Sequence, residues 1–181
     1  MNHTELTQAD VIQKAWFYAA HKHLKQMYPP GTLPYLAHVG SVCLELFPAL
    51  YTAPELDAKL SLCCAILHDT LEDTDATYED IAVEFGEAIA AGVSALSKRE
   101  GLRGETATLE SLSRIRQQPH EVWVVKLADR VANLGTPPVS WSLEKCRGYA
   151  TEGEHILREL GSASIVLAKR LAQRITVWKR L

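Results

Sequence analysis

The chain has 181 residues, of which 47% are apolar and 23% charged, so it can bury one sizeable core as an ordinary soluble globular protein does. Its formal net charge of -3 argues against broad binding to nucleic acid, which requires a basic face. No apolar run approaches the roughly 20 residues that cross a bilayer, and the segment MNHTELTQAD lacks the basic and apolar regions of a secretory signal.

Helical periodicity characterises the first part of the chain. Thr7 with Asp10 can cap a first helix, and the segment YPPGTLP, which begins at Tyr28, should end it. The segment TAPE, residues 52–55, resembles a capping box with proline in the first turn, so it should begin a further helix. Helices are therefore predicted over residues 7–28, 35–47 and 52–71.

The middle of the chain continues as helices separated by short breaks. Thr77 with Asp80 should cap a helix, and Gly86 is placed to end it. The segment KREGLRGET, which begins at Lys98, is polar and contains two glycines, so we expect a flexible loop there. Helices are predicted over residues 77–86, 87–98, 108–118 and 121–134.

In the last part of the chain, the sequence predicts a loop, GTPPVSWS, followed by two long helices over residues 142–160 and 162–178, with Gly161 between them. No alternating strand pattern flanked by hairpin turns is present in the sequence. It contains no internal repeat, low-complexity segment or linker that would separate domains. We therefore predict an all-α fold, a single compact domain over residues 1–181 with about eight to ten helices.

The four cysteines indicate a reducing environment. Cys63 and Cys64 are adjacent within an apolar helical pattern, and no CxxC motif occurs. Buried free thiols are a better explanation of this arrangement than a disulfide framework. Together with the missing signal sequence, this predicts a cytoplasmic protein.

In the stretch CCAILHDTLEDTDAT, residues 63–77, one histidine and three carboxylates directly follow an apolar run, within residues 68–73. His68 and Glu72 are four residues apart, as are Asp69 and Asp73, so each pair lies on one face of a helix. His68 and Asp69 can converge on one point only where the helix end lets both side chains turn inward. That arrangement suits a metal with nitrogen and oxygen ligands, and the following carboxylates could act on a water molecule.

Two further candidate ligands lie far from this stretch. His38 is in the second predicted helix, and Asp129 lies in VVKLADRVANLG, outside the apolar stripe that begins at Val124. Simpler explanations exist, since His38 could be a hydrogen-bonding residue and Asp129 could pair with Arg130 or Lys126 at the surface. EDTD could likewise be only a polar loop. Jointly these explanations need unrelated causes, and burying such charges unpaired is costly, whereas a divalent cation would neutralise them.

These residues, in this order, resemble the HD-domain phosphohydrolases, whose ligands follow a His…His-Asp…Asp pattern. HDTLEDTDATYEDIAVEFG and KLADRVANL are more similar to the hydrolase domain of the RelA/SpoT alarmone enzymes, and GTLPYLAHVGSV resembles that family's Gly-x-Pro-Tyr-x-x-His segment. The resemblance runs from Ala15 to Arg174. It implies an HD-type helical bundle and a stand-alone small alarmone hydrolase.

The resemblance also implies roles for individual residues. The implied metal ligands are His38, His68, Asp69 and Asp129. The family's usual ion is Mn²⁺, one per chain, although these ligands could also bind iron or zinc. Glu72 and Asp73 match the acidic pair that orients and deprotonates the attacking water. The residues implied to contact the substrate are Lys25, Tyr28, Lys98, Asn133, Lys145 and Tyr149.

The implied reaction is hydrolysis of the 3′-diphosphate of a nucleotide alarmone, which yields pyrophosphate and a nucleoside 5′-di- or triphosphate. The sequence departs from the family at Met27 and Tyr28, where arginines are usual, and at Ala37 and Val39, where Asn and Pro are usual. Tyr28 could stack on a base or only pack at a helix end. An adenine alarmone is therefore an alternative to (p)ppGpp. Hydrolysis of another nucleotide phosphate and a catalytically silent nucleotide-binding module also stay open, and we expect no nucleic acid, membrane or obligate protein partner.

Overall fold

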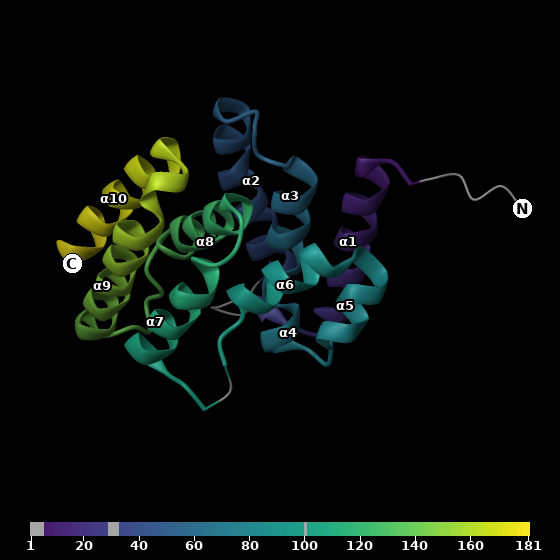
Figure 1. The fold of residues 1–181 in the computed structure, drawn as a ribbon. Coiled ribbons are helices and arrows are strands. Elements are labelled where there is room, and N and C mark those ends of the chain that lie inside the picture. Colours follow the sequence, from purple (N-terminus) through teal and green to yellow (C-terminus); the bar gives the residue numbers. More distant parts are fainter. Residues whose placement is uncertain (1–5, 29–32, 100) are drawn as a thin grey trace, which may run out of the picture.

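Helices form almost all of the secondary structure in the residues that the structure, a computed structural model, describes, which are 6–28, 33–99 and 101–181 (Figure 1). The all-α fold class predicted from the sequence is confirmed. The helices are α1 (Gln8–Lys22), α2 (Leu36–Thr52), α3 (Ala58–Leu67), α4 (Thr70–Asp73), α5 (Tyr78–Phe85), α6 (Glu87–Leu96), α7 (Gly104–Ile115), α8 (His120–Asn133), α9 (Leu143–Leu160) and α10 (Ile165–Lys179). A short antiparallel hairpin, β1 (Met27–Tyr28) with β2 (Leu33–Pro34), follows α1. None of the described helices is long and apolar enough to cross a membrane.

Helix α8 is the centre of the described fold. It packs against α2 and α3 on one side and against α9 and α10 on the other (Figure 1). Its predicted apolar stripe is confirmed, because Val124, Leu127, Val131 and Leu134 are all fully buried. Since both sides of α8 are covered, a polar residue on it, such as Asp129, is held in the interior and needs partners there.

The predicted helix starts at Thr7 and Thr77 are confirmed. Each threonine hydroxyl accepts a hydrogen bond from the backbone of an aspartate three residues later, and that aspartate accepts one from the threonine backbone. Gly86, at φ 92°, lies between α5 and α6, a conformation that glycine adopts without steric cost. These features depend on residues within one turn, and local sequence therefore predicts them.

The prediction that the first helix runs to Tyr28 is wrong. Helix α1 ends at Lys22, and the chain turns and pairs β1 with β2. This pairing satisfies backbone groups that a longer helix would have satisfied internally. The remainder of the predicted break, residues 29–32, lies outside the described part of the chain.

The predicted end of the second helix near Phe47 is also wrong, since α2 continues through Pro48 to Thr52. A proline inside a helix removes one hydrogen bond and costs about 3 kcal/mol. Leu46 and Ala49 on the inner face are fully buried. Packing of this face offsets the loss, which local sequence cannot reveal.

The segment TAPE does not begin a helix. Helix α3 begins at Ala58 and is capped by Asp57, whose Oδ1 accepts from Leu60 N at 3.1 Å. The backbone N–H of Asp57 also donates to Glu121 of α8 at 2.9 Å. This contact between distant segments fixes the helix start. Helix α3 then ends at Leu67, and α4 is a separate turn.

The predicted polar loop after Lys98 is shorter than expected, because α7 begins at Gly104 and not at Thr108, and ends at Ile115. The Thr108 hydroxyl does not cap a helix start. It donates within the helix to the Gly104 carbonyl at 3.3 Å. One residue of the predicted loop, at position 100, lies outside the described residues.

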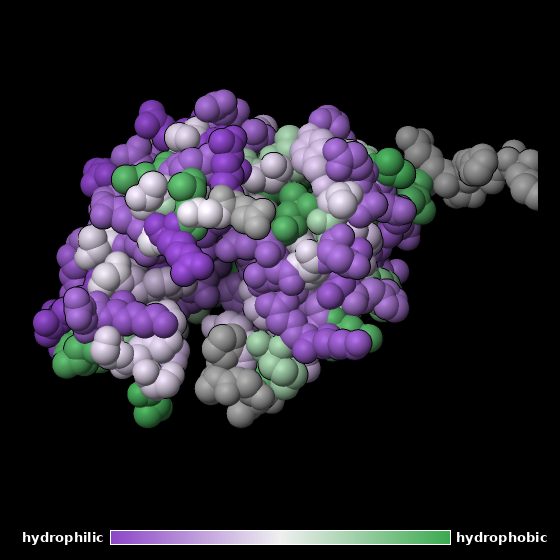
Figure 2. Space-filling view, turned by 90° about the horizontal axis from the view of Figure 1, so that it is seen from below, coloured by the Kyte–Doolittle hydropathy of each residue, from purple (hydrophilic) through white to green (hydrophobic). Residues whose placement is uncertain are grey.

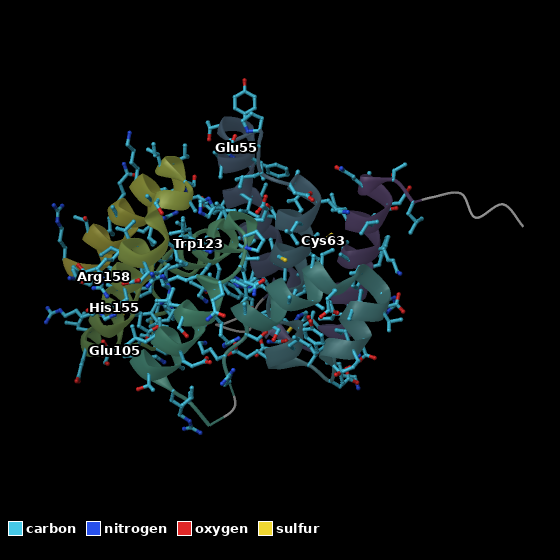
Figure 3. The ribbon with its side chains drawn as sticks, viewed as in Figure 1. Glu55, Cys63, Glu105, Trp123, His155 and Arg158 are labelled. Carbon is cyan, nitrogen blue, oxygen red and sulfur yellow. The ribbon has the colours of Figure 1, made fainter. Side chains whose placement is uncertain are left out.

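All four cysteines are free thiols, and Cys63, Cys64 and Cys146 are buried, as predicted. Cys43 is only partly buried. Figure 3 shows Cys63 on α3 among the packed helices. Burial raises the pKa of the Cys63 thiol to about 11, so this residue is a packing thiol and not a nucleophile at neutral pH.

Candidate active site

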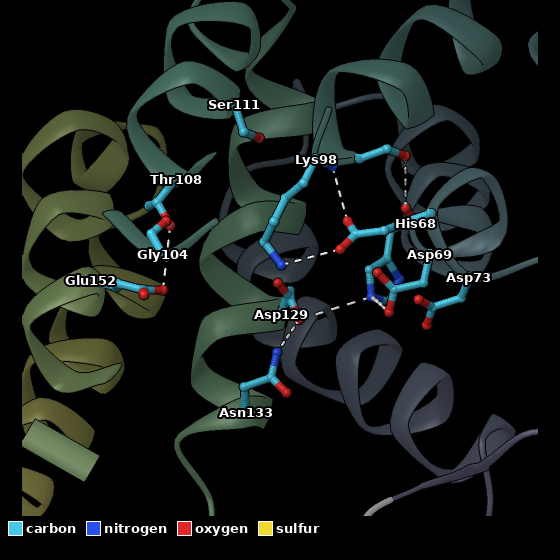
Figure 4. A network of polar contacts seen from close by, with 12 residues as sticks. His68, Asp69, Asp73, Lys98, Gly104, Thr108, Ser111, Asp129, Asn133 and Glu152 are labelled. Atoms are coloured by element: carbon cyan, nitrogen blue, oxygen red, sulfur yellow. Dashed lines mark hydrogen bonds and ion pairs between the residues drawn. The ribbon is translucent and has the colours of Figure 1, made fainter. Parts of the chain in front are cut away.

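The four side chains predicted to be metal ligands meet at one point of the fold (Figure 4). They are His38 from α2, His68 and Asp69 from the break between α3 and α4, and Asp129 from α8. The Nε2 atoms of His38 and His68 are 3.3 Å apart. Asp69 Oδ2 lies 2.8 Å from His68 Nε2, and Asp129 Oδ1 lies 3.5 Å from His38 Nε2. Ligand atoms of His38, His68 and Asp69 all lie within 4.8 Å of one another, and Asp129 Oδ1 approaches both histidines, so the group can hold one ion.

The end of α3 explains how His68 and Asp69 face the same point. The helix stops at Leu67, whose carbonyl accepts from Thr70 Oγ1 at 2.7 Å. Asp69 has φ -102° and ψ 0°, outside the helical range. Consecutive residues of a continuous helix point about 100° apart, and the break removes that separation. The sequence predicted that His68 and Asp69 could converge only at a helix end, and the structure places them at one.

The residues of this cluster fit a divalent cation. His68 Nδ1 donates to the Ala65 carbonyl at 2.8 Å, so Nε2 is the ring nitrogen that faces the cluster. Burial acts to lower the pKa of His68, but the Asp69 carboxylate outweighs burial and raises the pKa to about 9. The cluster therefore favours a positive charge here. Two imidazole nitrogens with two carboxylates are a donor set that divalent transition-metal ions accept.

Asp129 is stabilised by two neighbours on its own helix. Lys126 Nζ lies 3.1 Å from its Oδ2, and the Asn133 amide donates to its Oδ1. Burial acts to raise the pKa of Asp129, but the Lys126 ammonium and His38 hold the pKa well below its usual range. The alternative that Asp129 pairs with Lys126 is correct as a contact. The pair does not lie at the protein surface as that alternative assumed, because both side chains are buried beside the ligand cluster.

The predicted acidic pair lies on α4, next to the ligands. Glu72 accepts from the backbone N–H of Lys98 at 2.9 Å and from its ammonium at 3.2 Å. Asp73 Oδ2 accepts from the side-chain amide of Gln26 at 2.8 Å. Burial acts to lower the pKa of Lys98, but the Glu72 carboxylate outweighs burial and raises that pKa. Both acids are therefore held in place by residues from other elements.

A cavity of about 780 Å³ joins the acidic pair to three of the ligands, His38, Asp69 and Asp129. This volume is in the range of small-molecule sites. The face drawn in Figure 2 is mostly hydrophilic and hollowed near its middle. The structure thus brings ligands and acids to one concave site large enough for a nucleotide.

The predicted substrate contacts divide into two groups. Tyr28, Lys98, Asn133 and Tyr149 line the cavity, and Lys25 and Lys145 do not. Lys145 is exposed and its ammonium lies 4.1 Å from the centre of the Trp141 ring, which does line the cavity. The Tyr28 ring is stacked on His38, with centroids 5.3 Å apart and planes 6° apart. One face of Tyr28 is therefore already covered.

Sequence reasoning missed several residues that build the site. Tyr35 donates to Asp69, and Arg130 lines the cavity with its guanidinium 4.1 Å from the centre of the Tyr149 ring. Arg130 also pairs with Glu152 of α9 at 3.1 Å. Their spacing from the predicted ligands could have identified them, since Tyr35 precedes His38 by one helical turn and Arg130 follows Asp129 directly. Their partners lie in distant segments and could not be assigned.

The fold and the site define a helical protein with a His/Asp metal-binding cluster beside two carboxylates. The sequence profile of the HD domain matches residues 15–164. The chain belongs to the HD domain family, and a divalent metal site is a feature of that fold.

Known proteins of similar sequence include some named as 3′-pyrophosphohydrolases and others named as GTP pyrophosphokinases. The chain is 31% identical to the guanosine-3′,5′-bis(diphosphate) 3′-pyrophosphohydrolase MESH1 of Mus musculus, over 92% of this chain and 94% of that protein. An Aquifex aeolicus protein named guanosine-3′,5′-bis(diphosphate) 3′-pyrophosphohydrolase is 30% identical over 94% of this chain. The chain spans only 22% of that longer protein.

A solved structure has the same fold. It is described as a metazoan ortholog of SpoT that hydrolyses ppGpp and plays a role in starvation responses, and it matches with a TM-score of 0.80 over 98% of this chain and 99% of that one. The sequence identity is 24%. The RelA/SpoT branch inferred from the motifs is supported by these relatives.

Proposed function

We propose that the chain hydrolyses the 3′-diphosphate of a nucleotide alarmone, (p)ppGpp or its adenine analogue, releasing pyrophosphate and a nucleoside 5′-di- or triphosphate. The observation that carries this proposal is that four metal-type side chains meet beside one nucleotide-sized cavity, which three of them and the Glu72–Asp73 pair line. Relatives that align along almost all of their length and are named as 3′-pyrophosphohydrolases support it.

The proposed cofactor is one Mn²⁺ ion held by the two histidines and two aspartates of the cluster. A divalent ion bound there supplies a Lewis acid for a phosphoryl oxygen and lowers the pKa of water. His38 and His68 would each contribute one ring nitrogen, and Asp69 and Asp129 would contribute negative charge. Tyr35 and Lys126 hold the two carboxylates in place.

In the proposed reaction, water attacks the phosphorus joined to the 3′ oxygen, and that oxygen leaves and becomes the nucleoside 3′-hydroxyl. Glu72 and Asp73 orient the water and take its proton. Lys98, which pairs with Glu72 at 3.2 Å, is placed to neutralise charge on the diphosphate. Asn133 and Tyr149 line the same cavity and contact the rest of the substrate in this proposal.

Substrate turnover tests the proposal directly. Mn²⁺-loaded protein is incubated with guanine and adenine nucleotides that carry a 3′-diphosphate, and with common nucleoside mono-, di- and triphosphates. Release of pyrophosphate and orthophosphate is measured separately. Pyrophosphate from a 3′-diphosphate supports the proposal, and the better of the two bases identifies the alarmone.

Two results would contradict it. Orthophosphate from a monophosphate ester would make the protein a phosphatase of another nucleotide. Absence of turnover with one metal bound per chain would favour a silent nucleotide-binding module.

A further inference from the structure

A chain of polar contacts that is buried at its first member leads from the end of α1 to the proposed catalytic acid Asp73, which is exposed. His23, the residue after α1, is 2% exposed, and its Nδ1 lies 2.6 Å from Gln26 Oε1. The other end of the same amide, Gln26 Nε2, lies 2.8 Å from Asp73 Oδ2. Neither His23 nor Gln26 is needed to hold a metal ion, so these contacts require another explanation.

The direction of both hydrogen bonds follows from chemistry. An ionised carboxylate only accepts, so Gln26 must present its amide nitrogen to Asp73. The amide oxygen then faces His23 and can only accept, so His23 Nδ1 carries the hydrogen. The chain therefore runs in one direction, from His23 through Gln26 to Asp73, and each member fixes the orientation of the next.

The start of this chain is rigid. The His23 ring stacks on Tyr35, with centroids 4.7 Å apart and planes 26° apart. Tyr35 in turn donates to the ligand Asp69. The backbone of Gln26 makes two hydrogen bonds: its N–H donates to the His23 carbonyl at 2.9 Å, and its carbonyl accepts from the Tyr35 backbone N–H at 3.0 Å. Gln26 thus has little freedom to move away from Asp73.

We propose that His23 and Gln26 are positioning residues that fix the carboxylate of Asp73 for the attacking water. The Gln26 amide occupies Oδ2 of Asp73 and leaves Oδ1 free to accept from water. Without this donor the exposed Asp73 side chain rotates among several rotamers. The inference rests on the proposed role of Asp73 in hydrolysis.

The decisive variant is Gln26→Glu, which is nearly isosteric. A glutamate at this position still accepts from His23, but it cannot donate to Asp73 and repels its charge. We expect kcat for pyrophosphate release to fall about 10-fold or more, as when other supporting contacts of an active site are removed. Gln26 lines the cavity, so the added negative charge also raises KM for an anionic substrate, and the fall in kcat is the readout of positioning.

Two further variants separate positioning from general effects. His23→Phe keeps the ring on Tyr35 and removes only the donor to Gln26, so kcat should fall in the same direction by a smaller factor. Gln117→Glu makes the same charge change at an exposed residue whose side-chain amide donates to the Ser113 carbonyl, so it should behave as wild type. A Gln26→Glu enzyme with wild-type kcat would overturn the proposal.

A crystal structure of the Mn²⁺-loaded Gln26→Glu protein judges the inference independently of turnover. We expect the Asp73 carboxylate to leave its wild-type rotamer while the metal ligands stay in place. An unchanged Asp73 rotamer would overturn the positioning role. If the wild-type protein releases no pyrophosphate, the proposed function fails, and the position of Asp73 still decides whether His23 and Gln26 orient it.

Discussion

Asp129 illustrates how a buried carboxylate is stabilised in this fold. Its two oxygens accept from Lys126 and Asn133, and it also faces the nitrogens of His38 and His68. A carboxylate in the protein interior without such partners would be strongly disfavoured. The same contacts that make the residue tolerable also point its Oδ1 at the proposed metal position.

Replacing Asp129 should remove the metal. We expect Asp129→Asn, which keeps the shape of the side chain, to lose most bound Mn²⁺ because one anionic ligand is gone. Metal content per chain after dialysis, measured by elemental analysis, checks this. Asp75→Ala is the control, because that carboxylate is 87% exposed and pairs with Lys22, and this variant should keep one ion. Full metal content in Asp129→Asn would refute the proposed ligand set.

The acidic pair should be separable from the metal ligands. We expect Glu72→Gln and Asp73→Asn to lower kcat by about 10²- to 10⁴-fold, the usual contribution of a general base. Both variants should still bind one metal per chain, since neither residue is one of the four proposed ligands. Parallel assays of pyrophosphate release and metal content check both points. Loss of the metal in either variant would reassign that residue as a ligand.

At the scale of elements, the close approach of α6 to α3 and α8 supports the helices that carry the ligands. A Cβ atom added at Gly92 of α6 would lie 2.7 Å from Cys64 Sγ and 3.0 Å from Val122 Cγ2. Both neighbours are fully buried, so neither can move into solvent. Only glycine allows this helix spacing.

We expect Gly92→Ala to lower the free energy of unfolding by about 1–3 kcal/mol, the range for overpacked cores. The matched control is Gly148→Ala in α9, where an added Cβ meets nothing within 4 Å. That change should be neutral or raise stability by up to about 1 kcal/mol, because alanine favours helix more than glycine does. Urea unfolding of the three proteins checks both. Equal stability of Gly92→Ala and wild type would show that α6 can shift.

The elements also show what the sequence can and cannot predict. The caps at Thr77 and Gly86 depend on near neighbours, and the apolar stripe of α8 depends on its own spacing, so all were predictable. The β1–β2 hairpin has only two residues per strand, too few to leave a periodic signal. The passage of α2 through Pro48 depends on packing against other helices, which local sequence does not contain.

The candidate site divides in the same way. Its proposed ligands and acids were identified because they occur in a fixed order in the sequence. The residues that orient them were missed. Gln26 and Tyr35 act on residues of the α3–α4 region more than 30 positions away, and only the folded chain brings them together. These orienting residues can therefore be identified only from tertiary contacts and not from residue type.

At the scale of the whole molecule, the charge of the cavity bears on how an anionic substrate could enter. Four carboxylates and three basic side chains line the described part of the cavity, which leaves one net negative charge when its histidine is neutral. Lys98, Lys126 and Arg130 each pair with a carboxylate. A diphosphate would be repelled from this site until a divalent cation reversed the net charge.

We expect hydrolysis of a 3′-diphosphate to require one metal ion held by His38, His68, Asp69 and Asp129. Metal-free protein is titrated with Mn²⁺ while pyrophosphate release is followed from a nucleotide that carries this group. There should be no release before metal is added, and the rate should rise and saturate at one ion per chain. Pyrophosphate release by the metal-free protein in the presence of a chelator would contradict this requirement.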